Sequence, residues 1–336
     1  MRMDRRAGLL FLRKKEISYY GTATELSKAR YNFAAASVGN YAVFGGGQTM
    51  ASSYSSVVDA YNTSLTRSTP TALSVARYSL AATSVGNYAV FGGGQTTSSN
   101  RSSVVDAYDT SLVRSTPTAL SVARSGLAAA SIGNYALLAG GYTGNRSSVV
   151  DAYDTSLVRS TPTALSVARS GLAAASIGDY ALFAGGLTSS YSSVVDAYNT
   201  SLTRSTPTAL SVARSGLAAA SIGNYALLAG GYTGGYSAVV DAYNTSLTHS
   251  TPTALSVGRS GIGGTTVDSY ALFAGGGISG GHSAAVDAYG TALVHSTPSE
   301  LSVARTCVAA SINGYALFGG GLTGSASSVV DVYQVA

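Results

Sequence analysis

The chain has 336 residues, and 10% of them are charged, against about 25% in an average soluble domain. Its single cysteine excludes an intramolecular disulfide and a cluster of thiolate metal ligands. Gly, Ser, Asn or Asp interrupts every apolar run before it reaches the roughly 18 residues of a membrane-spanning helix, so we expect a soluble protein without a transmembrane segment.

Most of the net charge belongs to the first 16 residues, which hold +4 of the total of +5. A nucleic-acid surface would need clustered Lys and Arg on the folded body, so nucleic acid is not an expected partner. The apolar stretch over residues 7–12 is short for a secretory signal and no clear cleavage site follows it. We predict a disordered basic tail over residues 1–16, with a peripheral membrane anchor as the alternative, and a folded domain over residues 17–336.

The rest of the chain repeats with a period of about 45 residues. A Tyr-Ala pair marks the same place in each unit, and successive pairs are 47, 47, 45, 45, 45 and 45 residues apart. The tyrosines of these pairs are Tyr41, Tyr88, Tyr135, Tyr180, Tyr225, Tyr270 and Tyr315. Each unit contains four short segments separated by turn residues, which predicts four strands and therefore a blade of a β-propeller.

The four segments of the third unit differ in character. Residues 127–132 are rich in Ala and Ser, which suits strands crowded around a central axis. Residues 135–139 are apolar at consecutive positions, as in a strand covered on both faces, and residues 149–152 alternate between two faces. The fourth segment contains Pro162, which favours a sheet edge. This order predicts a blade that runs from hub to rim.

The two ends of the chain are predicted to complete one blade together. The last unit stops after its third segment, SSVVDVYQVA, and the N-terminal YYGTATELSKAR aligns with RSTPTALSVAR of the other units. We therefore predict an all-β, seven-bladed propeller with four antiparallel strands per blade, in which residues 17–27 form the outer strand of the last blade. A monomeric ring is expected, either alone or as part of a larger assembly.

Three features of the unit resemble the kelch repeat: a starting Arg, a Gly-Gly doublet after an apolar strand, and a V-x-x-Y-[DN] strand. The doublets are Gly46-Gly47, Gly93-Gly94, Gly140-Gly141, Gly185-Gly186, Gly230-Gly231, Gly275-Gly276 and Gly320-Gly321. The resemblance covers residues 17–336. The family's tryptophan is missing, because the chain contains no Trp. We expect a leucine after a shorter turn to supply the plug in its place, at Leu65, Leu112, Leu157, Leu202, Leu247 and Leu293.

Three positions per unit vary while the rest of the repeat hardly changes. The position three residues before the Val-Val pair is Tyr54, Arg101, Arg146, Tyr191, Tyr236, His282 and Ala326. The position after each doublet is Gln48, Gln95, Tyr142, Leu187, Tyr232, Gly277 and Leu322. The position after each starting Arg is Tyr31, Tyr78, Ser125, Ser170, Ser215, Ser260 and Thr306. The kelch resemblance implies that these positions line a shallow pocket on one face, which we call the candidate face.

Two explanations of this variation remain open. Exposed loop tips drift freely because little packs against them, but drift would favour small polar residues. Five of the seven tips are instead Tyr or Arg, which are enriched in binding hot spots. The loops of the first, second and sixth units are also longer, so the rim is expected to be asymmetric and able to select a ligand.

An Asp and an Arg recur in every unit. The aspartates are Asp59, Asp106, Asp151, Asp196, Asp241, Asp287 and Asp331, and the arginines are Arg30, Arg77, Arg124, Arg169, Arg214, Arg259 and Arg305. A catalytic site would break the symmetry of the repeat, so we interpret both sets as structural pairs or turn hydrogen bonds.

Enzymatic alternatives find little support. A kelch-type copper oxidase would need two histidine ligands, but His249 and His295 replace an Arg of other units and are interpreted as surface substitutions. His282 is the histidine expected on the candidate face. Cys307 aligns with a Gly of other units on the hub strand and is predicted to be a packed thiol. A sialidase-like site would need acidic partners, and Glu occurs only at positions 16, 25 and 300. No catalytic residue, metal site or cofactor is predicted.

The sequence thus favours a non-enzymatic scaffold that binds a protein, peptide or glycan. The alternatives are a structural module of a larger surface or virus-like assembly and, less favoured, a kelch-fold enzyme. The expected ligand-binding residues are Tyr54, Arg101, Arg146, Tyr191, Tyr236, His282, Gln48, Gln95, Tyr142, Tyr232, Tyr31 and Tyr78.

Overall fold

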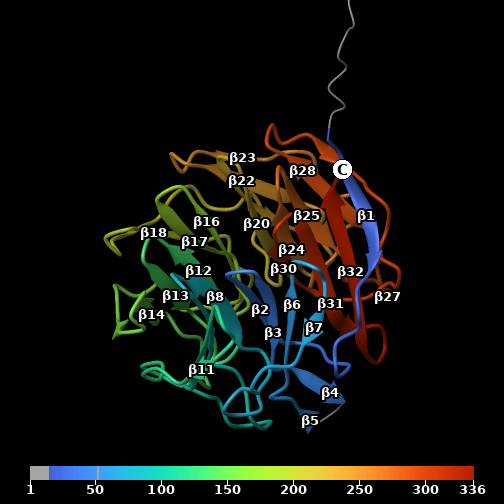
Figure 1. Ribbon diagram of the computed structural model, residues 1–336. Helices are drawn as coiled ribbons and strands as arrows, with labels where there is room; N and C mark the ends of the chain where they lie inside the picture. The colour runs from blue at the N-terminus through green and yellow to red at the C-terminus, as the bar shows by residue number, and fades with distance from the viewer. Residues whose placement is uncertain (1–14, 51–52) are drawn as a thin grey trace, which may run out of the picture.

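The computed structural model describes residues 15–50 and 53–336, which form an all-β, seven-bladed propeller. Each blade is a four-stranded antiparallel sheet, and the blades stand in a ring around a central axis (Figure 1). This confirms the predicted fold class. Within the described residues, no helix is long and apolar enough to cross a membrane. Residues 1–14 of the tail predicted over residues 1–16 lie outside the described residues, whereas Glu16 is already bonded to the backbone of Ala336.

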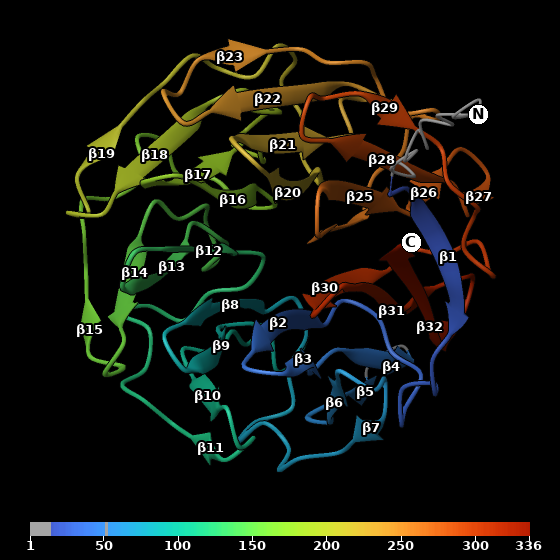
Figure 2. The same cartoon turned by 45° about the horizontal axis from the view of Figure 1, so that its top comes forward.

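In the first six blades the strands follow the chain from hub to rim, as predicted. Figure 2 shows β2, β8, β12 and β16 close to the axis and β11, β15, β19 and β23 at the outside. In hub-to-rim order, the strands of these blades are β2 (Ala34–Val38), β3 (Tyr41–Gly45), β6 (Val58–Asn62) and β7 (Arg67–Ser68); β8 (Ala81–Val85), β9 (Tyr88–Gly92), β10 (Val105–Asp109) and β11 (Arg114–Ser115); β12 (Ala128–Ile132), β13 (Tyr135–Ala139), β14 (Val150–Asp154) and β15 (Arg159–Ser160); β16 (Ala173–Ile177), β17 (Tyr180–Ala184), β18 (Val195–Asn199) and β19 (Arg204–Ser205); β20 (Ala218–Ile222), β21 (Tyr225–Ala229), β22 (Val240–Asn244) and β23 (His249–Ser250); and β24 (Gly263–Val267), β25 (Tyr270–Ala274), β28 (Val286–Gly290) and β29 (His295–Ser296).

The seventh blade closes the ring with both ends of the chain. It contains β30 (Val308–Ile312), β31 (Tyr315–Leu322), β32 (Ala326–Val335) and, at the rim, β1 (Ile17–Thr22). Figure 1 shows β1 lying along β32. Glu16 and Ala336 exchange backbone hydrogen bonds of 3.0 Å beside this pairing. The predicted closure is confirmed, although the strand ends at Thr22 rather than at residue 27.

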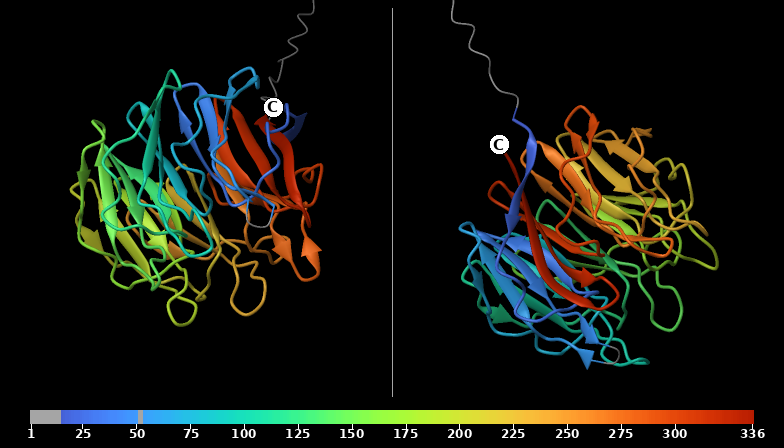
Figure 3. Two further views of the ribbon diagram at one scale, coloured as in Figure 1. Left: turned by 90° about the horizontal axis from the view of Figure 1, so that it is seen from below. Right: turned by 90° about the vertical axis from the view of Figure 1, so that its right-hand side faces the viewer.

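Two short hairpins extend the longer loops of blades 1 and 6. They pair β4 (Gln48–Met50) with β5 (Ser53–Tyr54) and β26 (Gly277–Ile278) with β27 (Gly281–His282). In blade 7 the corresponding residues prolong β31 and β32 themselves, with Leu322 opposite Ala326. The start of β1 and the C-terminus lie at the other end of these strands, because Ile17 pairs with Val335. Figure 3 shows the C-terminus on the face away from the hairpins.

The structure adds two details to the strand predictions. Residues of the third strand alternate between two faces, but both faces are buried: Val150, Asp151 and Tyr153 of β14 are all at most 1% exposed, because neighbouring blades cover both faces of the sheet. The outer strand β15 covers only Arg159 and Ser160, and Pro162 lies beyond it. The rest of that segment instead returns towards the hub, where the Leu165 amide donates to the Ser148 carbonyl at 2.8 Å.

The repeated arginine joins neighbouring blades. The backbone amide of Arg124 donates to the Ser102 carbonyl of blade 2 (3.2 Å). Its guanidinium pairs with Asp151 of blade 3 (2.7 Å) and donates to the Leu138 carbonyl (2.9 Å). The same Arg–Asp pairing recurs in each described blade with fully buried side chains. The predicted structural role is confirmed.

The interfaces between blades are plugged mainly by tyrosine. Tyr153 is fully buried, and its hydroxyl donates to the Thr118 carbonyl of the preceding blade at 2.8 Å. Leu157, the predicted plug, packs against the same apolar cluster but is only half-buried. It also has a φ of 61°, a left-handed conformation in which a leucine is strained. The leucine therefore lies at the predicted position between the blades, but the prediction missed the tyrosine, which is buried more completely in the same interface.

Candidate functional site

The three variable positions of each blade are neighbours across the sheet. In blade 3 the Tyr142 amide donates to the Ser125 carbonyl at 2.8 Å, and Tyr142 pairs in turn with Arg146. The equivalent residues line up in the other blades, and we call each set a variable row. From hub outwards the rows are Tyr31–Gln48–Tyr54, Tyr78–Gln95–Arg101, Ser125–Tyr142–Arg146, Ser170–Leu187–Tyr191, Ser215–Tyr232–Tyr236, Ser260–Gly277–His282 and Thr306–Leu322–Ala326.

The glycine doublet fixes the backbone from which each row begins. Gly140 and Gly141 have φ values of 69° and 106°, where glycine is favoured because it has no Cβ. A Cβ would lie 2.7 Å from the Arg169 carbonyl oxygen at Gly140, and 2.8 Å from the Ser125 carbonyl oxygen at Gly141. The doublet therefore lets two segments approach closely, and it sets the position of the next residue, Tyr142.

Two groups of variable side chains meet across the seams between blades 1, 2 and 3. The rings of Tyr54 and Tyr78 stack with centroids 4.8 Å apart. Burial is the main cause that raises the pKa of the Tyr78 hydroxyl, and the nearby Tyr54 raises it further. Next to them, the guanidinium carbons of Arg101 and Arg146 lie 4.8 and 5.3 Å from the ring centre of Tyr142. We call Arg101, Tyr142 and Arg146 the cationic cluster.

Three further tyrosines meet across blades 4 and 5. The Tyr232 ring contacts Tyr191 at 6.0 Å and Tyr236 at 5.3 Å between centroids, both edge-on. Tyr232 and Tyr236 are 36% and 39% exposed, so this tyrosine cluster offers ring surface to solvent. In blades 6 and 7 the rows carry mostly small residues. Large aromatic and basic side chains therefore occupy one arc of the candidate face rather than the whole ring.

The remaining predicted residues belong to the rows but do not join these clusters. Gln95 Nε2 donates to the Ser98 carbonyl of its own loop at 2.8 Å. Tyr31 and Gln48 pair through their backbones, as do Gly277 and His282. The structure thus places the twelve predicted residues on one face, and it groups eight of them into contacting sets.

Sequence reasoning missed an aliphatic component of this face. The residue two places before each starting Arg is an exposed valine in six blades, between 36% and 42% exposed. Because each Arg amide is bonded to the segment after a loop tip, these valines lie close to the variable rows. The SVAR motif, SVGR in one unit, could have revealed them, but only its Arg was interpreted. The valines are Val75, Val122, Val167, Val212, Val257 and Val303.

The prediction that His249 and His295 are surface substitutions was wrong. Their side chains are 16% and 17% exposed, and their Nε2 atoms lie 2.6 and 2.7 Å from the buried Asp241 and Asp287 carboxylates. They take the place of the outer-strand arginines because their rings also reach the aspartate. No group of three or more His, Cys, Asp or Glu in the described part of the chain could hold a metal ion.

Cys307 occupies the apolar position of the repeat rather than the glycine position. It directly precedes β30, as Leu127 precedes β12, and it is 6% exposed within an apolar cluster. The last unit has one residue fewer before its hub strand, which misled the alignment. The thiol donates to the Ala274 carbonyl at 3.2 Å, and burial raises its pKa. The prediction of a packed thiol is confirmed.

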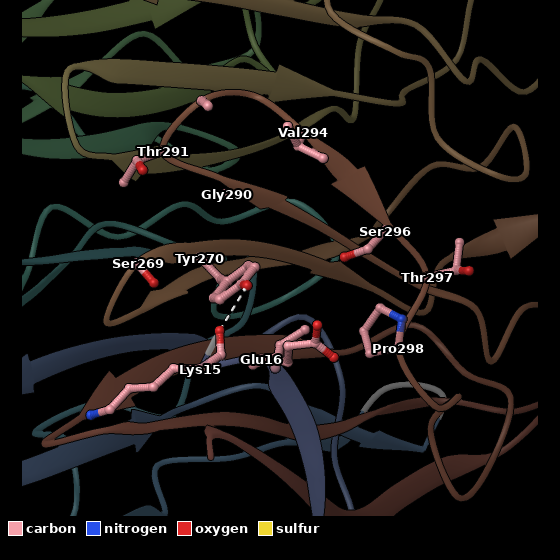
Figure 4. Close-up of a pocket in the computed structure, with 12 residues that line it drawn as sticks. Lys15, Glu16, Ser269, Tyr270, Gly290, Thr291, Val294, Ser296, Thr297 and Pro298 are labelled. Atoms are coloured by element: carbon pink, nitrogen blue, oxygen red, sulfur yellow. Dashed lines mark hydrogen bonds between the residues drawn. The ribbon is translucent and has the colours of Figure 1, made fainter. Parts of the chain in front are cut away.

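The hub and the closing seam contain hollows of different character. The channel on the axis has a volume of about 240 Å³ and is lined by Ala, Ser and Thr. Its hydroxyls are engaged between blades, as in the Ser37 bond to the Ser311 carbonyl at 2.6 Å. A groove of about 530 Å³ lies between β1 and blade 6, on the face opposite the variable rows (Figure 4). There the Tyr270 hydroxyl donates to the Lys15 carbonyl at 3.2 Å, which attaches the residues just before β1 to blade 6.

Comparison with known proteins identifies the fold but no family. No protein-family model and no curated protein matches the sequence. The solved structure of YjhT matches with a TM-score of 0.59 and 12% sequence identity, over 94% of this chain and 98% of that chain. The two chains share a propeller fold. At this identity the likeness shows the fold alone, and a fold of this kind hosts many functions.

Proposed function

We propose that this protein is a non-enzymatic scaffold that binds a protein, peptide or glycan through the candidate face. The observation that carries the proposal is the convergence of three variable positions into one variable row per blade. Drift would act independently at each position, but a surface under selection would vary as a contiguous patch. We further propose that the unit is a kelch-type repeat, since its Arg, Gly-Gly and Tyr motifs perform the same structural task in successive blades.

The chemistry of the rows supports binding. Tyrosine presents a large flat surface and loses little conformational entropy when it is immobilised. Arginine pairs with carboxylates and stacks on planar groups. Because these side chains fill the arc of blades 1 to 5, a ligand would contact the ring unevenly. The rows contain no Asp, Glu or Cys, so they supply no carboxylate or thiolate for catalysis, which supports a non-enzymatic role.

A glycan and peptide array tests the proposal. The C-terminus lies on the opposite face, where Ala336 pairs with Glu16 beside the Ile17–Val335 pair, so a C-terminal tag leaves the candidate face free. We expect the wild-type protein to bind a subset of the spots, and the Tyr191→Ala, Tyr236→Ala, Arg146→Ala triple variant to lose that binding. The matched control is Val113→Ala with Val158→Ala, two valines exposed in the opposite turns, and it should bind as the wild type does.

The outcomes separate the two main functions. Equal binding by the triple variant and the wild type would contradict a site on the candidate face. If the folded wild-type protein binds nothing, the structural-module alternative is favoured over a ligand-binding scaffold. Circular dichroism on each variant shows whether a loss of binding reflects a loss of fold.

A further inference from the structure

Arg101 and Arg146 differ from the other arginines of residues 15–50 and 53–336. Every other arginine in this part of the chain forms an ion pair with an aspartate. Within the same residues, Arg101 and Arg146 have no carboxylate partner. They come from adjacent blades, yet their guanidinium groups lie over one ring, that of Tyr142. Among the described residues, the two guanidinium groups without a carboxylate partner are therefore gathered at one place.

This arrangement favours an anion that arrives from outside. The Tyr142 ring attracts both cations through its π face, and Arg101 Nη1 is fixed further by donating to the Ser99 carbonyl at 2.9 Å. Two like charges near one ring repel each other, and a carboxylate bound close to them would offset that repulsion. Guanidinium groups bind carboxylates with two parallel hydrogen bonds. Arg146 is exposed, so a ligand can reach it directly.

The surroundings favour a polypeptide as the source of that carboxylate. Val122 and Val167 are 40% and 39% exposed. Their segments are bonded next to the two arginines: two residues after each valine, the Arg124 amide donates to Ser102 and the Arg169 amide to Ser147, the residues that follow Arg101 and Arg146. Exposed aliphatic groups next to guanidinium groups match an acidic residue flanked by apolar ones, whereas a sugar offers few apolar groups for them. The loops are also rich in Tyr, Ser, Gly and Asn, as antibody paratopes are.

We propose that the cationic cluster binds the side-chain carboxylate of an acidic peptide segment in a protein partner. This inference rests on the proposed function, since it assigns a ligand class to the same face. The tyrosine cluster of blades 4 and 5 then contacts a neighbouring part of the partner. The acidic residue sets the preference, and the aromatic surface adds affinity without regard to charge.

The test is an array on which each short peptide is present twice, once with Asp and Glu and once with Asn and Gln in their place. Oligosaccharides that contain uronic acids share the array. The full-length wild-type protein should bind acidic peptides about tenfold more tightly than their amide versions, as expected for a charge-assisted pair. The Arg101→Gln, Arg146→Gln double variant should lose this preference, and the corresponding double Lys variant should keep part of it.

A matched variant separates charge from general contact. Tyr191→Ala with Tyr236→Ala should weaken acidic and amide peptides alike and preserve their ratio. Peptide binding without an acid preference, or a preference retained by the double Gln variant, would overturn the inference and leave the proposed function intact. Binding of uronic-acid oligosaccharides alone would overturn the polypeptide assignment. Failure of the folded wild-type protein to bind any spot would refute the proposed function, and the inference with it.

Discussion

The hydroxyl of Tyr19 donates to Oδ1 of Asp331 at 2.8 Å and so joins residues 312 positions apart in the chain. In the other blades an arginine or histidine of the outer strand lies near the equivalent Oδ1 atom. The N-terminal strand therefore supplies the same contact with a neutral phenol. Burial, and to a smaller extent the hydrogen bond to Asp331, raises the pKa of Tyr19 to about 12. This donor therefore keeps its proton at neutral pH.

We expect Tyr19→Phe to destabilise the protein by about 1–2 kcal/mol, because one hydrogen bond to a buried carboxylate is lost. Urea unfolding measures the change. Tyr20→Phe is the matched control, since Tyr20 is a neighbour on β1 that is 52% exposed, and it should change stability little. Equal effects of the two substitutions would show that the bond to Asp331 does not contribute to closure.

Deleting residues 1–27 should lower the melting temperature by at least about 5 °C. The deletion removes β1, whose Ile17 and Tyr19 pack against the apolar cluster between blades 6 and 7, and it leaves the edge of β32 unpaired. A second variant that lacks only residues 1–14 separates the contribution of β1 from that of the preceding residues. An unchanged melting temperature after the longer deletion would contradict closure by the N-terminal strand.

Two arginines on one carboxylate should differ in their contribution to stability. Arg124 is fully buried against Asp151 Oδ2, whereas Arg159 is 25% exposed and lies 3.3 Å from Oδ1. Burial lowers the pKa of the Arg124 guanidinium, and Asp151 works against that effect. We expect Arg124→Met to cost about 3–5 kcal/mol and Arg159→Gln about 1 kcal/mol. Similar values from chemical denaturation would show that burial does not govern these pairs.

Asp241 should contribute to a loss of stability in acid. Burial alone would raise the pKa of its carboxyl, but the Ser211 amide, Arg214 and His249 together hold the pKa below its ordinary value. A lowered folded pKa gives stability that is present above the unfolded value of about 3.9 and is lost as the pH falls through the folded pKa.

Unfolding free energies measured between pH 7 and pH 2 test this effect. Asp241→Asn should be less stable than the wild type at pH 7. The difference should shrink as the pH falls below about 4, because the unfolded carboxyl takes up a proton there while the folded one stays ionised to lower pH. Asp179→Asn, in an exposed turn, is the control and should follow the wild-type profile. A constant difference between Asp241→Asn and the wild type at all pH values would contradict the depressed pKa.

Several features could be predicted because they depend only on the period of the repeat. The number of blades, the strand order and the N-terminal closure follow from counting units and from the missing fourth segment. Details that depend on packing were not accessible in this way. The burial of β14 on both faces depends on neighbouring blades, which are far away in the sequence. The inward position of His249 depends on the pairing of β22 with β23, which brings the ring to Asp241. Cys307 was assigned to the wrong position because one deleted residue cannot be located without the strand register.

For the candidate site, the sequence by itself determined which positions vary and that they share a face, since the repeat places each of them at the same point of its blade. The tertiary structure alone decided which of them meet. Arg101 reaches the ring of Tyr142 only because blades 2 and 3 pack side by side and the glycine doublet brings their backbones close together. Contacts between blades, rather than the pattern within one unit, thus turned separate variable residues into a cationic cluster and a tyrosine cluster.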